Sequence, residues 1–289
     1  MSASILVVGA GGQVGSELAA ATTSHRLSAL TRAELDITDV DAVTQAFAIH
    51  QPDIVINAAA YTAVDKAEQD SAAAYALNCD AVGYLARACQ AAGAPLLHIS
   101  TDYVFSGNKL AAYSEDDAID PLGVYGASKA AGEAVLRDVL EAHIILRTSW
   151  VFSATGNNFV KTMLRLGKER DQLGIVSDQE GCPTSAASIA DVLLDIADRY
   201  LKSETVNWGT YHYCNQPETT WFDFARAIFE QAGGFDNLTV KPINTSDYPT
   251  LAKRPQNSVL DCRKLTANFS IKQVPWKEEL GKVLSHLED

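Results

Sequence analysis

Residues 5–15 read Ile5-Leu6-Val7-Val8-Gly9-Ala10-Gly11-Gly12-Gln13-Val14-Gly15, and this stretch decides the fold. Its apolar start predicts a strand, and the residues after Gly15 favour a helix. Two glycine patterns overlap between them, Gly9-x-Gly11 and Gly9-x-x-Gly12-x-x-Gly15. In either pattern one glycine permits a tight turn, a second lets backbone N–H groups approach a pyrophosphate, and a third lets helix and strand pack closely. Between a first strand and a helix, this loop predicts a dinucleotide site.

The first half of the chain continues this alternation of apolar runs and helical patterns. Strands are predicted at residues 5–8, 27–30, 53–57, 95–100 and 143–147, and helices near 12–23, 39–50, 71–93 and 126–141. Continuous apolar strands alternating with helices are typical of a parallel sheet that is covered on both faces. Right-handed crossovers then give an α/β fold with a doubly wound parallel Rossmann sheet.

The pattern loosens after Trp150. Helices are expected near 158–170, 186–201 and 221–232, strands near 175 and 211–214, and an irregular segment at about 237–271. We expect residues 1–149, joined by about 185–214, to form a dinucleotide-binding domain. Residues 150–184 and 215–289 would form a smaller C-terminal substrate-binding lobe. No repeat or low-complexity linker separates the two parts, so they should pack closely.

Composition excludes several classes of protein. The 289 residues are 47% hydrophobic and 20% charged, as in an ordinary globular protein, and the net charge of −13 disfavours binding to nucleic acid or anionic membranes. The five cysteines show no CxxC spacing, which argues against a disulfide framework or a zinc site. Because the chain has no apolar run of about 18 residues and no signal-like start, we expect no membrane span and a cytoplasmic location.

The second strand informs the choice of cofactor. It ends in Leu30-Thr31-Arg32, where NAD-binding proteins place a carboxylate for the ribose hydroxyls. Since Arg32 could instead meet a 2′-phosphate, the sequence favours NADPH, with NADH and a solvated Arg32 as the alternative. Asp36 is better suited to the adenine edge than to the ribose. The third strand ends in small side chains that leave room for a cofactor.

Tyr125 and Lys129 form the candidate catalytic pair. They lie four residues apart at the start of a helix and so share one face. A nearby ammonium favours phenolate, so Lys129 is expected to lower the pKa of Tyr125 and make it a proton donor or acceptor near neutrality. Thr101, at the end of the fourth strand, is the candidate hydroxyl that bonds the same substrate oxygen, with Ser100 as its competitor.

These features resemble the extended short-chain dehydrogenase/reductase family, through the glycine loop and the Tyr-x-x-x-Lys spacing. Further stretches resemble one branch of it, the dTDP-4-dehydrorhamnose reductases. They cover nearly the whole chain in order: residues 57–68, 100–105, 147–152 and 156–159, Asp178-Gln179 with Gly181 and Pro183-Thr184, and Arg254-Pro255 with Asn257-Ser258.

The resemblance implies the last step of dTDP-L-rhamnose synthesis. The 4-keto group of dTDP-4-dehydro-L-rhamnose would be reduced by hydride transfer from NAD(P)H. Tyr125 would be the proton donor, Lys129 would lower its pKa and hold the nicotinamide ribose, and Thr101 would bond the reacting oxygen.

The resemblance also assigns binding residues by position. Gly12, Gln13 and Val14 are expected at the pyrophosphate of the cofactor, together with Gly9 and Gly15 of the same loop. Asp36 and Ile37 are expected at the adenine. The residues expected along the rest of the cofactor are Ala60, Tyr61, Thr62 and Ile99. Thr101, Asp102 and Trp150 would contact the dTDP-sugar, although Trp150 could equally pack between the lobes. Arg254 is a candidate clamp for the substrate pyrophosphate, because a guanidinium pairs bidentately with phosphate oxygens.

Some members of the family hold Mg²⁺ at a dimer contact through glutamates. Glu17 matches one of them, but Ala187 stands where another would be, so the metal is doubtful and a homodimer stays open. Glu17 could instead be a first-turn glutamate that the helix dipole favours. Two other functions remain as alternatives. One is another nucleotide-sugar epimerase, dehydratase or reductase of the same family, and the other is a non-catalytic regulatory subunit resembling the methionine adenosyltransferase β subunit.

Overall fold

A six-stranded parallel sheet forms the centre of the molecule, in the order β10-β5-β4-β3-β1-β2. The computed structural model describes residues 3–288. The strands are β1 (Ser4–Val8), β2 (Arg26–Leu30), β3 (Ile54–Asn57), β4 (Leu96–Thr101), β5 (His143–Thr148) and β10 (Gly209–His212). The chain leaves β1 toward β2 and returns to β3 on the other side of β1. This reversal opens a crevice at the carboxyl ends of β1 and β3, where open α/β sheets bind ligands.

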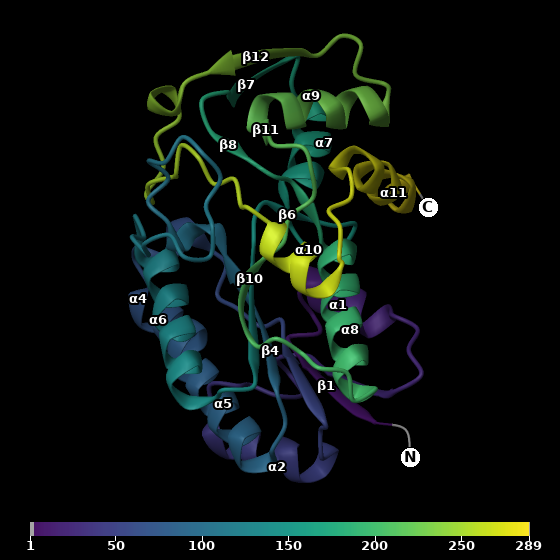
Figure 1. Cartoon of the computed structure of the whole chain (residues 1–289). Helices are drawn as coiled ribbons and strands as arrows, with labels where there is room; N and C mark the ends of the chain where they lie inside the picture. Colours follow the sequence, from purple (N-terminus) through teal and green to yellow (C-terminus); the bar gives the residue numbers. More distant parts are fainter. Residues whose placement is uncertain (1–2, 289) are drawn as a thin grey trace.

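Helices cover both faces of the sheet, which confirms the predicted fold class (Figure 1). On one face lie α1 (Gln13–Ala20), α8 (Ala186–Leu201) and α10 (Arg263–Phe269), and on the other α2 (Val40–His50), α5 (Ala81–Ala92) and α6 (Val124–Val139). The alternation within β1 explains the two layers. Ile5 and Val7 pack into the first core, while Leu6 and Val8 pack into the second.

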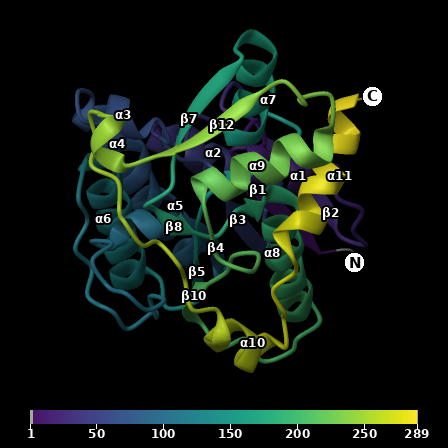
Figure 2. The same cartoon turned by 90° about the horizontal axis from the view of Figure 1, so that it is seen from above.

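A smaller lobe stands over the carboxyl ends of the strands (Figures 1 and 2). Its core contains residues of α7 (Phe159–Glu169), α9 (Trp221–Ala232), α11 (Trp276–Glu288) and the strand β7 (Gln172–Val176). Two short strand pairs lie outside the central sheet, β6 (Val151–Phe152) with β9 (Thr184–Ser185) and β8 (Glu180–Gly181) with β11 (Thr219–Thr220). Two short helices, α3 (Val64–Ala67) and α4 (Ser71–Tyr75), lie between β3 and α5. Within residues 3–288, no helix combines the length and apolarity needed to cross a bilayer.

The segment 237–271 corrects one expectation, since it is not irregular throughout. It contains the strand β12 (Thr239–Ile243), which pairs in parallel with β7, and the helix α10. Pro242 disguised the strand because proline lacks an N–H group and is normally excluded from sheets. Pro242 lies opposite Ile175 and is tolerated here because, among residues 3–288, β7 is the one strand that pairs with β12. The other edge of β12 therefore needs no donor.

Candidate active site

The glycine loop has the geometry that its sequence requires. Gly9 has φ +83°, and a Cβ on it would lie 2.5 Å from the backbone nitrogen of Ala59. A Cβ on Gly15 would lie 2.1 Å from the carbonyl oxygen of Gly9, so helix α1 meets the loop too closely for any side chain there. Gly12 is the residue before α1, and the first N–H groups of the helix therefore face the loop. Such a cradle fits the pyrophosphate of a dinucleotide.

A cavity of about 510 Å³ follows this loop along the carboxyl ends of the strands. Most of the predicted cofactor, catalytic and substrate residues line it together. They are Gly12, Gln13, Val14, Ala60, Thr62, Ile99, Thr101, Asp102, Tyr125, Lys129 and Trp150. Gln13 also ties the loop to the lobe, because its Oε1 accepts bonds of 3.0 Å from Ser153 and from Asn158, the residue before α7.

Tyr125 stands in the first turn of α6 and faces Thr101. Gly126 permits this approach, because a Cβ there would lie 2.1 Å from the carbonyl oxygen of Tyr103. Burial raises the pKa of Tyr125 to about 12 and outweighs a hydrogen bond with Thr101, which acts in the opposite direction. The expectation that the pKa of Tyr125 is lowered is therefore wrong for this structure, because desolvation of the phenolate dominates.

Lys129 lies one turn further along α6 and is 1% exposed. Its Nζ donates to the carbonyl oxygen of Ile99 at 2.7 Å and lies 3.2 Å from Nε2 of His98. Burial lowers the pKa of Lys129 to about 8, against the opposing charge of Glu133. The buried ammonium is thus easier to deprotonate than an ordinary lysine.

Asp102 is a buried carboxyl beside the reacting groups. Its Oδ1 accepts from the Thr101 hydroxyl at 2.9 Å, and its Oδ2 has no hydrogen-bond partner among the described residues. Burial raises the pKa of Asp102 to about 7. An unpartnered buried oxygen is costly, so it is available to a polar group of a ligand.

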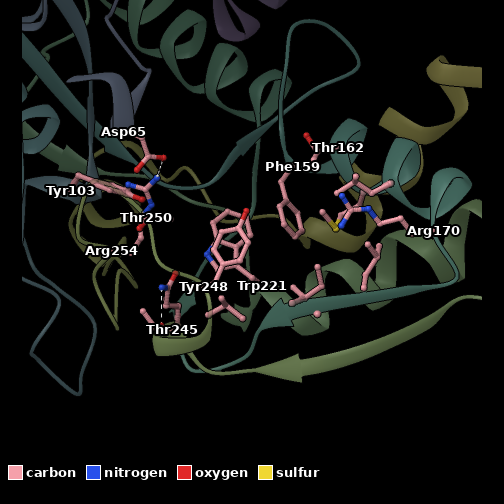
Figure 3. Close-up of a pocket in the computed structure, with 17 residues that line it drawn as sticks. Asp65, Tyr103, Phe159, Thr162, Arg170, Trp221, Thr245, Tyr248, Thr250 and Arg254 are labelled. Carbon is pink, nitrogen blue, oxygen red and sulfur yellow. Dashed lines mark hydrogen bonds and ion pairs between the residues drawn. The ribbon is translucent and has the colours of Figure 1, made fainter. Parts of the chain in front are cut away.

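A second cavity, of about 440 Å³, lies under the smaller lobe and shares Tyr103 with the first. Figure 3 shows Arg254, Asp65 and Tyr103 at one end, Arg170 at the other, and aromatic rings between them. Arg254 donates to Asp65 at 2.6 Å and lies over the Tyr103 ring, while its buried Nη1 has no partner among the described residues. The two cavities therefore adjoin at Tyr103.

Trp150 joins the two parts of the site. It lines the first cavity and stacks on Trp221 of the second, with ring centroids 3.6 Å apart and planes at 9°. Both sequence interpretations of Trp150 therefore remain compatible with its position: a ligand contact, and packing against the lobe.

Other predicted residues lie apart from the first cavity. Arg32 is largely exposed and pairs with Asp36 at 3.4 Å. Ile37 is buried in the core beneath α2, and Tyr61 donates from its hydroxyl to Asp70 at 3.3 Å. The cofactor roles of these residues stay predictions.

Glu17 is not the first-turn glutamate considered as its alternative role. Helix α1 begins at Gln13, which puts Glu17 in the second turn. Burial raises its pKa, and the neighbouring charges are Asp191, which raises it further, and His286, which lowers it. Among residues 3–288, no group of three or more His, Cys, Asp or Glu side chains is arranged to hold a metal.

Sequence reasoning missed several residues of the site. Asp65 and Tyr103 meet Arg254 only through contacts between distant segments, which spacing cannot reveal. Glu34 accepts from the N–H and hydroxyl of Thr31, both at 2.8 Å, and so brings a carboxylate to the end of β2. The sequence feature that could have identified Glu34 is its position near the end of the strand, three residues beyond Thr31.

Comparisons with known proteins agree with this geometry. The chain matches the RmlD substrate binding domain family over residues 3–288. It is 47% identical to the dTDP-4-dehydrorhamnose reductase of Aggregatibacter actinomycetemcomitans, with 99% of this chain and 100% of that protein covered.

Two solved structures are also similar. The dTDP-4-dehydrorhamnose reductase of Clostridium acetobutylicum has a TM-score of 0.91 at 38% identity, covering 99% of each chain. That of Bacillus anthracis, in complex with NADP, has a TM-score of 0.91 at 36% identity, covering 99% of this chain and 100% of the other. The resemblance inferred from the motifs is confirmed, and the chain belongs to the RmlD family of dTDP-4-dehydrorhamnose reductases.

Proposed function

We propose that this protein reduces the 4-keto group of dTDP-4-dehydro-L-rhamnose to give dTDP-L-rhamnose, as an NAD(P)H-dependent oxidoreductase. One observation carries the proposal: Thr101, Tyr125 and Lys129 meet in a cavity that begins at the glycine loop and shares Tyr103 with a second cavity. The names of the full-length relatives support the choice of substrate.

The residues of the first cavity have separate roles in this reaction. When bound, the reduced nicotinamide supplies a hydride to the carbonyl carbon. Tyr125 donates its hydroxyl proton to the carbonyl oxygen. The Thr101 hydroxyl donates to the same oxygen after turning its one proton away from Asp102 Oδ1, its acceptor in the free protein. Because the pKa of Tyr125 is about 12, the group is protonated and ready to donate at neutral pH. Positioned proton donors of this kind accelerate reactions by roughly 10²–10⁴-fold.

The second cavity supplies a place for the nucleoside diphosphate. Arg254 has a buried Nη1 without a partner among the described residues, which suits a phosphate oxygen. The free Oδ2 of Asp102 suits a sugar hydroxyl, and Trp150 lies between the two regions. We therefore assign Asp102, Trp150 and Arg254 to the substrate, with the sheet unit binding the cofactor and the smaller lobe binding the sugar nucleotide. A homodimer and a cytoplasmic location stay predictions.

A direct assay tests the proposed activity. The purified protein should oxidise NADPH or NADH when dTDP-4-dehydro-L-rhamnose is added, and the product should be dTDP-L-rhamnose. A protein that arrives with tightly held oxidised cofactor and interconverts 4-epimers would instead be an epimerase. A folded protein that binds both ligands without turnover would fit a regulatory subunit. Either result would refute the reductase proposal.

The choice of NADPH rests on Arg32. Its largely exposed guanidinium is paired with Asp36 at 3.4 Å and can be redirected to a 2′-phosphate. We expect Arg32→Ala to raise the KM for NADPH about tenfold, the low end for a charge-assisted hydrogen bond, and to leave the KM for NADH unchanged. The control is Arg165→Ala, which also removes an exposed arginine, in this case one that lies on α7. An equal effect on both cofactors would contradict the assignment.

A further inference from the structure

Three polar side chains meet beside the second cavity, just beyond the ends of two paired strands. Asp178 and Gln179 come shortly after β7, and Thr245 comes shortly after β12, which pairs in parallel with β7. Gln179 and Thr245 both line the cavity, and Figure 3 shows Thr245 in it together with Tyr248 and Trp221. Because Gln179 is only 6% exposed, its amide needs hydrogen-bond partners for its nitrogen and for its oxygen.

The hydrogen bonds around Thr245 fix the orientation of the Gln179 amide. The Thr245 hydroxyl donates its one proton to Oδ1 of Asp178 at 2.7 Å, because a carboxylate can only accept. The same hydroxyl oxygen lies 3.0 Å from Nε2 of Gln179, and it must accept there because its proton is already used. The nitrogen of the amide therefore faces Thr245, since the reverse orientation would place two acceptors against each other.

This orientation leaves Oε1 of Gln179 as an acceptor without a donor. Within residues 3–288, the bond to Thr245 is the one hydrogen bond of this amide. An unpartnered acceptor on a buried side chain that lines a cavity is available to a donor group of a ligand. The aromatic rings of Phe159, Trp221 and Tyr248 line the same cavity and offer flat surfaces on which a nucleotide base can pack.

We infer that Gln179 selects the base of the sugar nucleotide: its Oε1 accepts from the N3–H group of thymine or uracil and opposes cytosine, whose N3 is an acceptor. The inference rests on the proposed function, which places the nucleoside diphosphate in the second cavity with Arg254 at its phosphates. A cytosine in the same place would leave the buried acceptor unpaired, and sites built on such a bond reject ligands that cannot complete it. Thr245 is the positioning residue, because it holds the amide in this orientation.

Binding of free nucleotides tests the selection directly. Calorimetric titration of the wild-type protein with dTDP, dUDP and dCDP should give a dissociation constant at least about tenfold higher for dCDP than for the other two. All three carry the same deoxyribose and diphosphate, so only the base differs. Equal affinities for dTDP and dCDP overturn the inference. So does a dUDP affinity as weak as that of dCDP, because uracil also carries the N3 proton.

Two substitutions then identify the residues that make the selection. Gln179→Met removes the amide and should raise the dissociation constant of dTDP roughly threefold to tenfold, close to that of dCDP. Thr245→Val keeps Gln179 but frees its amide to turn and present Nε2 to cytosine, so dCDP should bind nearly as tightly as dTDP. Thr162→Val is the matched control, because Thr162 lines the same cavity and its hydroxyl donates to the carbonyl oxygen of Asn158. It should keep the wild-type preference.

Each outcome of these titrations decides the inference. A wild-type preference in Gln179→Met overturns it, and so does an equal loss of preference in Thr245→Val and Thr162→Val. Gln179 and Thr245 lie in different segments, so if one variant does not fold the other still decides. A wild-type protein that binds dTDP but does not reduce the dTDP-sugar would refute the proposed activity alone, whereas a protein that binds none of the nucleotides would refute both.

Discussion

Replacing Tyr125 by phenylalanine should lower kcat by two or more orders of magnitude while cofactor binding stays near normal. The substitution removes one oxygen, the hydroxyl that faces Thr101 in the first cavity. Loss of a positioned proton donor costs roughly 10²–10⁴-fold in rate. Steady-state kinetics with the dTDP-sugar, together with fluorescence titration of NADPH, measures the two effects separately.

Tyr211→Phe provides a matched control for this substitution. Tyr211 is also buried and donates its hydroxyl to the carbonyl oxygen of Asn207, outside both cavities. Its loss should cost about 1 kcal/mol of stability, the net value of a typical hydrogen bond, and leave kcat unchanged. If Tyr125→Phe turns over like the wild type, Tyr125 is not the proton donor.

The sequence was most informative where function depends on local spacing. Gly9 and Gly15 lie in one short segment, only six residues apart in the sequence. They approach each other closely in the structure, as a strand–loop–helix unit requires. Tyr125 and Lys129 lie one helical turn apart, so the helix alone brings them to one face. Short-range patterns of this kind are set by backbone geometry, and tertiary packing changes them little.

Long-range contacts could not be predicted in the same way. Arg254 meets Asp65 across 189 residues, and Trp150 stacks on Trp221 only after the lobe has folded over the sheet. The direction of the pKa shift of Tyr125 was mispredicted for the same reason. A lysine near a tyrosine predicts a lowered pKa, but the pKa of Tyr125 is raised, because burial is a property of the folded cavity and not of the spacing.

Removing Arg147 should destabilise the protein more than any single change at its surface. Arg147 is 2% exposed and donates two hydrogen bonds to the Glu133 carboxylate, from Nε to Oε1 at 2.8 Å and from Nη2 to Oε2 at 2.7 Å. The Ser100 hydroxyl donates to the same carboxylate at 2.6 Å, and Arg137 reaches it from the helix surface. Arg147→Met would leave a buried carboxylate with one half-exposed cation, which typically costs about 3–5 kcal/mol.

The pH dependence of this loss identifies its cause. In the wild type, burial is outweighed by Arg147 and Ser100, so the pKa of Glu133 lies below its ordinary value. That carboxylate contributes stability above the unfolded pKa of about 4.3, and the contribution is lost as the pH falls through the folded value. Without Arg147, burial should raise the folded pKa above the unfolded one. The gap in unfolding free energy between wild type and variant should therefore be widest near pH 7 and narrow as the pH falls.

Urea unfolding at several pH values measures this gap. Arg199→Met is the control, since Arg199 is one-third exposed and pairs with Asp195 at the surface, where such pairs are worth about 1 kcal/mol or less. The double variant Glu133→Leu/Arg147→Met removes the unpaired buried charge together with its partner and should recover part of the lost stability at pH 7. If the double variant is as unstable as Arg147→Met at pH 7, the cost comes from lost packing of the long arginine side chain and not from an unpaired buried charge.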